Sequence, residues 1–200
     1  MLVIGLTGPS GAGKSSVADL FAAHALPVIN ADEVYHALLI PPSLCLDELT
    51  HRFGLGILAP NGTLNRHALA EIVFSDTDAL AALNEITHHH VMSEIRRRLE
   101  QLRQENVVAV VIDAPQLFEA GAEKDCNVIV SVLAEKQLRL RRIMMRDGIT
   151  EEAAIGRMAV QKSDEFFRAH SDYVIENNES GDLLSDAVRK ILSEMGVLQR

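Results

Sequence analysis

Residues 8–15 read GPSGAGKS and have the spacing G-x-x-x-x-G-K-S of a loop that binds nucleotide phosphates. The glycines let the backbone curl until successive N–H groups face phosphate oxygens, and a helix that starts there adds partial positive charge. Lys14 would place a point charge on the β- and γ-phosphates, and the Ser15 hydroxyl would be a ligand for Mg²⁺. The pattern predicts a nucleoside triphosphate site formed by Gly11, Ala12, Gly13, Lys14, Ser15 and Ser16.

This phosphate loop, residues 8–15, leaves the fate of the γ-phosphate open, because water and a bound substrate are both acceptors in proteins that carry it. A signalling GTPase would carry N-K-x-D, and a protein kinase would carry H-R-D and D-F-G; none of these motifs occurs in the sequence. The alternative interpretation of the loop is a glycine-rich turn with a solvated lysine. The apolar run before it and the helical spacing after it favour the phosphate site.

Three acidic residues fall where strands are expected to end, which is where ligands bind in an open parallel sheet. Asp32 is the candidate general base that takes the proton of an acceptor hydroxyl. Asp113 is the candidate metal-shell carboxylate, beside Ser15 as a metal ligand, and Glu119 follows it closely. The alternatives are that Asp32 caps the next helix, that Asp113 forms a turn, and that Glu119 is a solvated loop residue.

The segment from 136 to 164 concentrates basic residues on helical spacing. Arg142 and Arg146 are i,i+4 and share a helix face, which Arg139 joins from i−3 of Arg142. Arg157 and Lys162 follow on the next expected helix. A hinged helical pair of this kind closes over ATP in small-molecule kinases, excludes water and stabilises charge on the transferred phosphoryl group. The alternative is a solvated surface helix with local salt bridges.

Two further polar groups have weaker patterns. His88, His89 and His90 are consecutive, and consecutive side chains on a helix point about 100° apart, so they do not converge on one metal ion. The start of a helix that lines a substrate cleft, or a solvated turn, are the interpretations that remain. Asn177 and Asn178 follow the last expected strand and suit either the edge of an adenine or a turn.

Alternating elements must position these residues. Short apolar runs predict strands at 2–6, 26–29, 107–113, 127–132 and 172–175. Helical spacing predicts helices at 43–53, 66–74, 77–86, 88–104, 136–146, 150–161 and 181–195. This order predicts an α/β fold with a doubly wound sheet of about five parallel strands, into which a helical region is inserted.

The composition narrows the class of protein. The chain has 200 residues and a net charge of −9, which suits one domain and argues against a surface that binds nucleic acid. Lys14 is the only Lys or Arg before residue 52, so basic charge is concentrated elsewhere. Cys45 and Cys126 form no CxxC pair, and two free thiols are expected. No apolar stretch is long enough to cross a membrane and no signal peptide is apparent, so a cytoplasmic protein is expected.

In order along the chain, a series of segments resembles the motifs of the dephospho-coenzyme A (dephospho-CoA) kinase family. They are 7–15, 30–32, 62–66 with Leu69, Val73 and Phe74, 83–88, 113–119, the set Arg142, Arg146, Asp147, Arg157 and Gln161, and 172–177. The resemblance covers nearly the whole chain. It implies a P-loop NTPase-type three-layer sandwich, with a core at about 1–32, 106–135 and 165–200, a helical CoA-binding insertion at about 33–105 and a lid at about 136–164.

The resemblance also implies a reaction, namely transfer of the ATP γ-phosphate to the ribose 3′-hydroxyl of dephospho-CoA with Mg²⁺, which completes coenzyme A synthesis. It implies catalytic roles for Asp32, Lys14, Arg142 and Arg146, and an adenine contact for Asn177. It implies substrate contacts from Asp32, Arg66, His88, Pro115, Leu117 and Glu119. The expected partners are small molecules, with no nucleic acid or membrane, and the chain is expected to be a monomer or a weak homo-oligomer.

The sequence departs from the family pattern at three positions. Asn30 stands where the family has an aspartate, His89 where it has the proline of an H-P pair, and Gln116 where it has a leucine. A P-loop kinase of another acceptor, such as a nucleoside or nucleotide, is the main alternative, and a regulatory P-loop ATPase is a more distant one.

Overall fold

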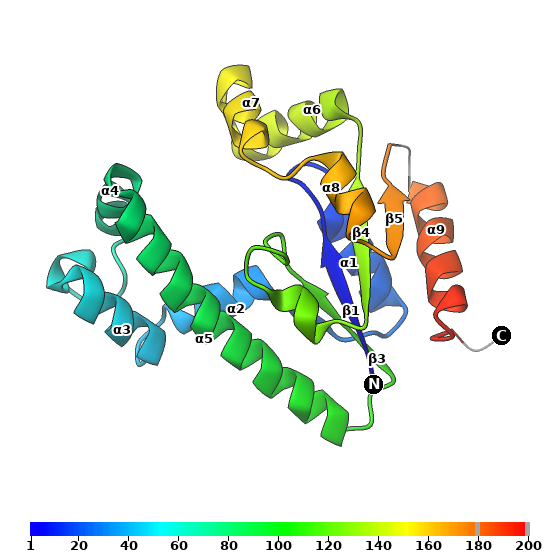
Figure 1. The fold of residues 1–200 in the computed structure, drawn as a ribbon, viewed down its shortest axis with the longest axis horizontal. Helices are drawn as coiled ribbons and strands as arrows, with labels where there is room; N and C mark the ends of the chain where they lie inside the picture. The colour runs from blue at the N-terminus through cyan, green and yellow to red at the C-terminus, as the bar shows by residue number, and fades with distance from the viewer. Residues whose placement is uncertain (179–180, 199–200) are drawn as a thin grey trace. The chain divides into compact units, whose positions relative to one another are not determined.

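The computed structural model describes residues 1–178 and 181–198 and divides the chain into two compact units (Figure 1). The first, called the core unit, comprises Met1–Ile29 and Leu102–Arg200. The second, called the helical unit, comprises Asn30–Gln101.

A five-stranded sheet with the strand order β2-β3-β1-β4-β5 forms the centre of the core unit. Its strands are β1 (Leu2–Thr7), β2 (Val28–Asn30), β3 (Ala109–Asp113), β4 (Val128–Leu133) and β5 (Tyr173–Glu176). The pairings of β1 with β3 and β4, and of β4 with β5, are parallel. β3 is buried along its whole length, as expected for a strand covered on both faces. The prediction of an α/β fold with five parallel strands is confirmed.

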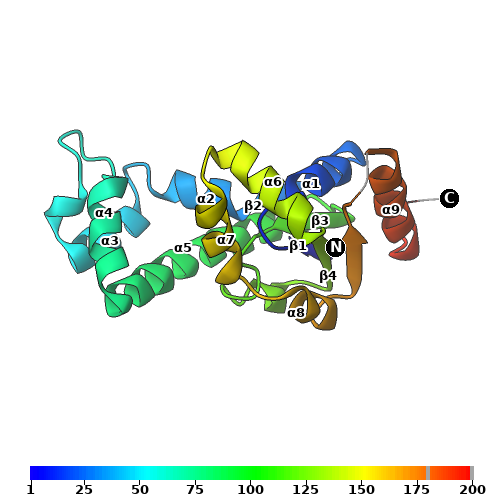
Figure 2. The same cartoon turned by 90° about the horizontal axis from the view of Figure 1, so that it is seen from above.

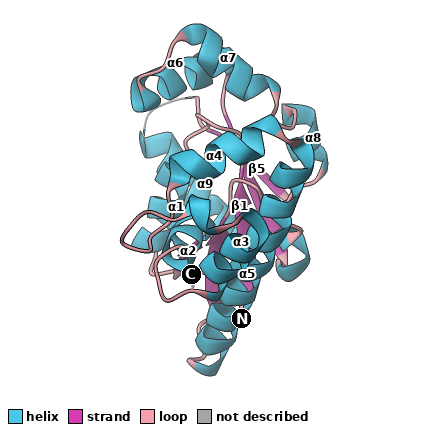
Figure 3. Ribbon diagram, turned by 90° about the vertical axis from the view of Figure 1, so that its left-hand side faces the viewer, coloured by secondary structure: helices cyan, strands magenta, loops and turns pink. Residues whose placement is uncertain are grey.

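Helices cover both faces of the sheet, which gives three layers (Figures 2 and 3). On one face, Ile4 and Leu6 of β1 belong to a buried apolar cluster with residues of α1 (Lys14–Ala23) and α9 (Gly181–Glu194). On the other face, a Cβ on Gly5 would lie 2.7 Å from the Cys126 sulfur, and α8 (Asp164–Ala169) packs on β4 and β5. The chain leaves β1 at Thr7, passes through the phosphate loop and enters α1 at Lys14. The first turn of α1 thus follows the carboxyl end of the central strand.

Residues 136–164 contain two helices, α6 (Lys136–Asp147) and α7 (Glu151–Ala159), which pack on each other. Gly148 ends α6 with a φ of 64°, and the Thr150 side chain caps α7 by accepting a hydrogen bond from the Ala153 N–H. The short helix α8 was not among the expected elements. The sequence feature that marks the start of α8 is Ser163, whose side chain caps the helix by accepting a hydrogen bond from the Phe166 N–H.

The helical unit contains α2 (Ala31–Leu38), α3 (Leu44–Phe53), α4 (Arg66–Ser75) and most of α5 (Thr77–Gln104). Its own apolar cluster includes Cys45, Leu49, Ile57, Leu69 and Val73. The unit therefore has a separate core, as a compact folding unit requires.

The prediction of two helices at 77–86 and 88–104 was wrong, because α5 runs unbroken through both. No glycine or proline interrupts residues 77–104, so the backbone hydrogen bonds continue through the histidines. Thr87, Val91, Ile95 and Leu99 are buried and follow each other at four-residue spacing, which places them along one side of a single helix.

Both cysteines are free, as expected. Burial raises the pKa of Cys45 to about 11 and that of Cys126 to about 12. Within residues 1–178 and 181–198, the structure contains no helix that is long and apolar enough to cross a membrane.

Candidate active site

The phosphate loop requires glycine at two positions for steric reasons. Gly8 has a φ of 146°, and a Cβ there would lie 2.2 Å from the Val132 carbonyl oxygen. Gly13 has a φ of 88°, and a Cβ there would lie 2.0 Å from Nδ2 of Asn177. A larger residue would collide with the backbone of Val132 at position 8 and with the Asn177 side chain at position 13, and both positions have a positive φ that favours glycine.

The N-terminus of α1 has no hydrogen bond from a capping side chain among the residues that the structure describes. By contrast, α2, α3, α4, α7 and α8 each have a side-chain cap. Because the first N–H groups of a helix lack partners within the helix, the start of α1 suits an anionic ligand. Ser15 and Ser16 lie in this first turn, and both are exposed.

Lys14 and Asp113 form an ion pair at the carboxyl ends of β1 and β3. The Asp113 side chain is 4% exposed, and that of Lys14 is 16% exposed. The pair holds the lysine beside the loop, where a phosphate would compete with the carboxylate for it.

Oxygen ligands of the kind that Mg²⁺ binds are available at this end of the sheet. The Ser15 hydroxyl and the Asp113 carboxylate both belong to the elements that meet at the loop. In the part of the chain that the structure describes, no three His, Cys, Asp or Glu side chains converge as a metal-binding group. A magnesium ion fits these residues if phosphate and water oxygens complete its shell, which is its usual arrangement in kinases.

Arg142 and Arg146 both reach from α6 to the phosphate loop. Arg142 Nη1 donates to the carbonyl oxygens of Gly11 and Ala12, both at 3.3 Å. Arg146 Nη2 lies 3.4 Å from the Ser10 hydroxyl, and the same guanidinium hydrogen-bonds Asp147 at 2.8 and 2.9 Å. That bonding raises the pKa of Arg146 and lowers the pKa of Asp147.

The sequence places Arg139 on the same helix face as Arg142 but does not predict it as a site residue. The structure places Arg139 in direct contact with the phosphate loop. It is only 6% exposed, and its Nε donates to the Ser10 carbonyl oxygen at 3.1 Å. Its other contacts are Asp164 at 3.1 Å and Gln161 at 3.2 Å. Burial lowers the pKa of Arg139, and the charge of Asp164 opposes that shift.

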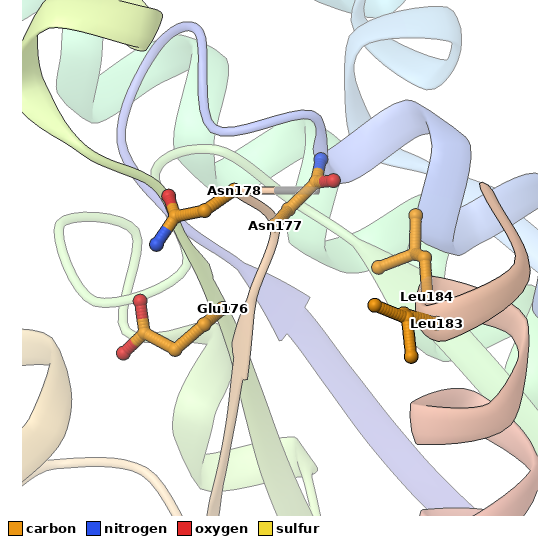
Figure 4. Close-up of a pocket in the computed structure, with 5 residues that line it drawn as sticks. All are labelled: Glu176, Asn177, Asn178, Leu183 and Leu184. Atoms are coloured by element: carbon orange, nitrogen blue, oxygen red, sulfur yellow. The ribbon is translucent and has the colours of Figure 1, made fainter. Parts of the chain in front are cut away.

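Asn177 lies at the end of β5 and backs the phosphate loop (Figure 4). Its side chain is buried, and Nδ2 donates to the Ala12 carbonyl oxygen at 2.8 Å. Its own carbonyl oxygen accepts a hydrogen bond from Arg142 at 3.1 Å. A cavity of about 250 Å³ adjoins it, lined by Glu176, Asn177, Asn178, Leu183 and Leu184. The amide therefore contacts the loop, and the cavity offers an apolar side and a polar side to a ligand.

The loop after β3 contributes residues of three kinds. Pro115 is exposed, and its carbonyl oxygen accepts a hydrogen bond from the Thr7 hydroxyl at 3.4 Å. Leu117 is fully buried, so its side chain packs in the protein instead of facing a ligand. Glu119 is exposed and forms an ion pair with Lys162 at 3.7 Å, which joins this loop to the segment between α7 and α8.

Three predicted site residues lie in the helical unit. Asp32 is exposed in the first turn of α2, whose cap is Asn30: the Asn30 side chain accepts hydrogen bonds from Asp32 N at 2.9 Å and Glu33 N at 3.1 Å. The alternative that Asp32 is the cap is thus wrong. Arg66 begins α4, and its Nη2 lies 2.7 Å from His36 Nδ1. His88 is half-buried in α5.

A glycine-rich phosphate loop lies between a central parallel strand and an uncapped helix, and two arginines reach it from α6. These features define a kinase of the P-loop fold. Solved structures agree with this class. The structure superposes on dephospho-CoA kinase from Campylobacter jejuni with a TM-score of 0.73 and 28% identity, covering 98% of both chains. Shikimate kinase from Acinetobacter baumannii has the same fold, with a TM-score of 0.55 at 17% identity over 98% of this chain and 94% of its own.

The sequence comparisons narrow the class to one family. The family model described as dephospho-CoA kinase matches residues 2–182. A dephospho-CoA kinase of Syntrophotalea carbinolica is 40% identical over 195 residues, which cover 98% of this chain and 92% of the relative. The chain belongs to the dephospho-CoA kinase family.

Proposed function

We propose that this protein transfers the γ-phosphate of ATP to the 3′-hydroxyl of the ribose of dephospho-CoA, which yields coenzyme A and ADP. The observation that carries the proposal is the set of lid arginines, Arg142 and Arg146, directed at a phosphate loop whose lysine is already in position. Family membership supports dephospho-CoA as the acceptor.

In this reaction the bond between the γ-phosphorus and the oxygen bridging to ADP breaks, and a bond to the 3′-oxygen forms. The proton of the 3′-hydroxyl passes to the Asp32 carboxylate, which we assign as general base. Lys14, Arg142 and Arg146 stabilise the negative charge on the transferring group and on ADP. Backbone N–H groups of 11–16 bind the phosphates.

The Ser15 hydroxyl would be a ligand for Mg²⁺, and the Asp113 carboxylate would support the ion from its hydration shell. The bound ion would supply positive charge that offsets the charge of the phosphates. The adenine of ATP would lie against Asn177, in the cavity that adjoins it. In that position the adenine ring would contact Leu183 and Leu184, which form the apolar side of the cavity.

The acceptor would be bound by Asp32, Arg66 and His88 of the helical unit and by Pro115 and Glu119 of the loop after β3, with Leu117 as a packing residue below that loop. We assign residues at about 33–105 as the CoA-binding insertion and about 136–164 as the lid, within one kinase domain. A cytoplasmic enzyme that acts as a monomer or a weak homo-oligomer fits this assignment.

The test is an acceptor assay on the purified protein. Dephospho-CoA and Mg-ATP are supplied, and coenzyme A and ADP are quantified by chromatography. The expected result is one coenzyme A formed for each ADP. A panel of nucleosides, nucleotides and shikimate serves as control, with little ADP expected from each. Absence of coenzyme A, or faster turnover with another acceptor, would overturn the proposal.

A further inference from the structure

Ser10 of the phosphate loop is contacted by three lid side chains, each at a different polar atom. Its N–H donates to Gln161 Oε1 at 3.2 Å, and its carbonyl oxygen accepts from Arg139 Nε at 3.1 Å. Its hydroxyl lies 3.4 Å from Arg146 Nη2. The residue is half-buried. Two of these contacts are to the backbone of Ser10, so they depend on the position of the loop and not on its side chain.

The two side chains that hold the backbone also hold each other. Gln161 Oε1 accepts a second hydrogen bond from Arg139 Nη2 at 3.2 Å, and Arg139 Nη1 pairs with Asp164 at 3.1 Å. Arg139 lies in the first turns of α6, whereas Gln161 follows α7. The beginning and the end of the lid therefore meet at one residue of the phosphate loop.

This junction is rigid for physical reasons. The guanidinium of Arg139 is planar and largely buried, and its contact with Asp164 is charge-assisted, so its orientation is fixed. Gly11, the residue after Ser10, packs closely against the backbone of α6, because a Cβ on Gly11 would lie 2.6 Å from the Arg139 carbonyl oxygen. Movement at the base of the lid must therefore shift residues 10 and 11 with it.

We propose that Arg139 and Gln161 are positioning residues that couple the lid to the phosphate loop through the backbone of Ser10. The inference deepens the proposed function and rests on it. With the junction intact, the loop and the lid arginines keep fixed positions relative to one another, so the γ-phosphate is transferred to the acceptor and not to water. Loosening the junction lets the loop and the lid move independently, and ATP hydrolysis without acceptor phosphorylation increases.

The test measures how many ATP molecules are consumed for each coenzyme A formed. Gln161→Met keeps the length of the side chain but removes the acceptor oxygen, and we expect the ratio to rise about fivefold, the scale of one hydrogen bond. Gln161→Glu keeps an acceptor oxygen and is expected to retain the wild-type ratio. Gln137→Met is the matched control, since Gln137 is an exposed glutamine on α6.

A second variant acts at the other partner. Arg139→Lys keeps the charge beside Asp164 but cannot reach Ser10 and Gln161 together, so the ratio should rise as in Gln161→Met. Thermal unfolding of each variant is measured in parallel. A purely structural role predicts a lower Tm with an unchanged ratio, and that result would overturn the proposal, as would a Gln161→Glu ratio as high as that of Gln161→Met. Failure of the wild-type protein to form any coenzyme A contradicts the proposed function instead.

Discussion

The site residues of the core unit and those of the helical unit are held in different ways. In the core unit, Lys14 pairs with Asp113, Arg142 donates to the loop backbone, and Asn177 is buried against Ala12. In the helical unit, Asp32 and Arg66 are exposed at the starts of two helices. The residues that we assign to the nucleotide are thus held by contacts within the protein, whereas Asp32 and Arg66, which we assign to the acceptor, are exposed.

This difference implies two kinds of energetic cost. Preorganised donors need little rearrangement when charge develops, so their removal should affect kcat strongly. Exposed groups contact the acceptor only when it binds, so their removal should affect the KM for the acceptor, unless a group takes part in the chemistry itself. Asp32 is assigned to that exception.

Asp32→Asn should lower kcat about 10³-fold while the KM for ATP stays within about twofold, because a general base is lost and no nucleotide contact is removed. Steady-state kinetics with dephospho-CoA as the varied substrate measure this. Glu33→Gln is the matched control, since Glu33 is exposed beside Asp32 in the same turn of α2. Retention of more than a tenth of wild-type kcat would remove Asp32 from the role of base.

Lys14→Met should lower kcat/KM for ATP about 10²-fold, because a preorganised cation no longer meets the β- and γ-phosphates. Lys190→Met on α9 serves as the control, since Lys190 pairs with Glu194 of the same helix at 3.9 Å and its side chain is 78% exposed. Equal kinetics in the two variants would contradict the assignment of Lys14.

Arg66→Met should raise the KM for dephospho-CoA about tenfold and leave kcat and the KM for ATP nearly unchanged, since one charged hydrogen bond to the acceptor is removed. Arg52→Met, an exposed arginine on α3 of the same unit, is the control. A decrease in kcat without a change in KM would place Arg66 in the chemical step and weaken the division between the two units.

Glu94→Gln tests the packing of the helical unit and not its site. The hydrogen bond from Arg97 is the largest cause that lowers the pKa of Glu94 to about 2, and Arg98 adds to it. A carboxylate with a lowered pKa stabilises the fold above its ordinary pKa, and this stabilisation is lost as the pH falls toward 2.

Because Arg97 is mostly exposed, the variant should lose only about 0.5–1 kcal/mol at pH 7. Urea unfolding at pH 7 and at pH 3 measures it. The difference from wild type should be smaller at pH 3, because the carboxyl group of Glu94 is largely protonated in the unfolded chain there, while in the folded protein it stays mostly ionised. An equal difference at both values would contradict the assigned role of the carboxylate.

The sequence was most informative where a structure depends on local pattern. The phosphate loop follows from eight consecutive residues, and the strands follow from short apolar runs. Helix starts were harder to predict, since an asparagine two residues before Asp32 proved to be the cap. The length of α5 was also missed, because the three histidines suggested a boundary that the backbone does not make.

The parts that could not be predicted depend on contacts between residues far apart in the chain. Arg139 shares a helix face with Arg142, but only the folded chain shows that it is buried against Ser10. Leu117 lies in a matching motif, yet tertiary packing directs its side chain into the protein. Local spacing thus identified the residues that carry charge, while the residues that position them required the structure.

The close approach of Gly13 and Asn177 has a consequence for the way the site folds. The phosphate loop is formed by eight consecutive residues, but the amide that backs Ala12 comes from Asn177, 165 positions along the chain. Folding that pairs such distant residues is slow to begin, because the intervening chain must close first. The phosphate loop therefore gains the support that shapes it only once β5 has joined the sheet, so its order depends on the folding of the whole core unit.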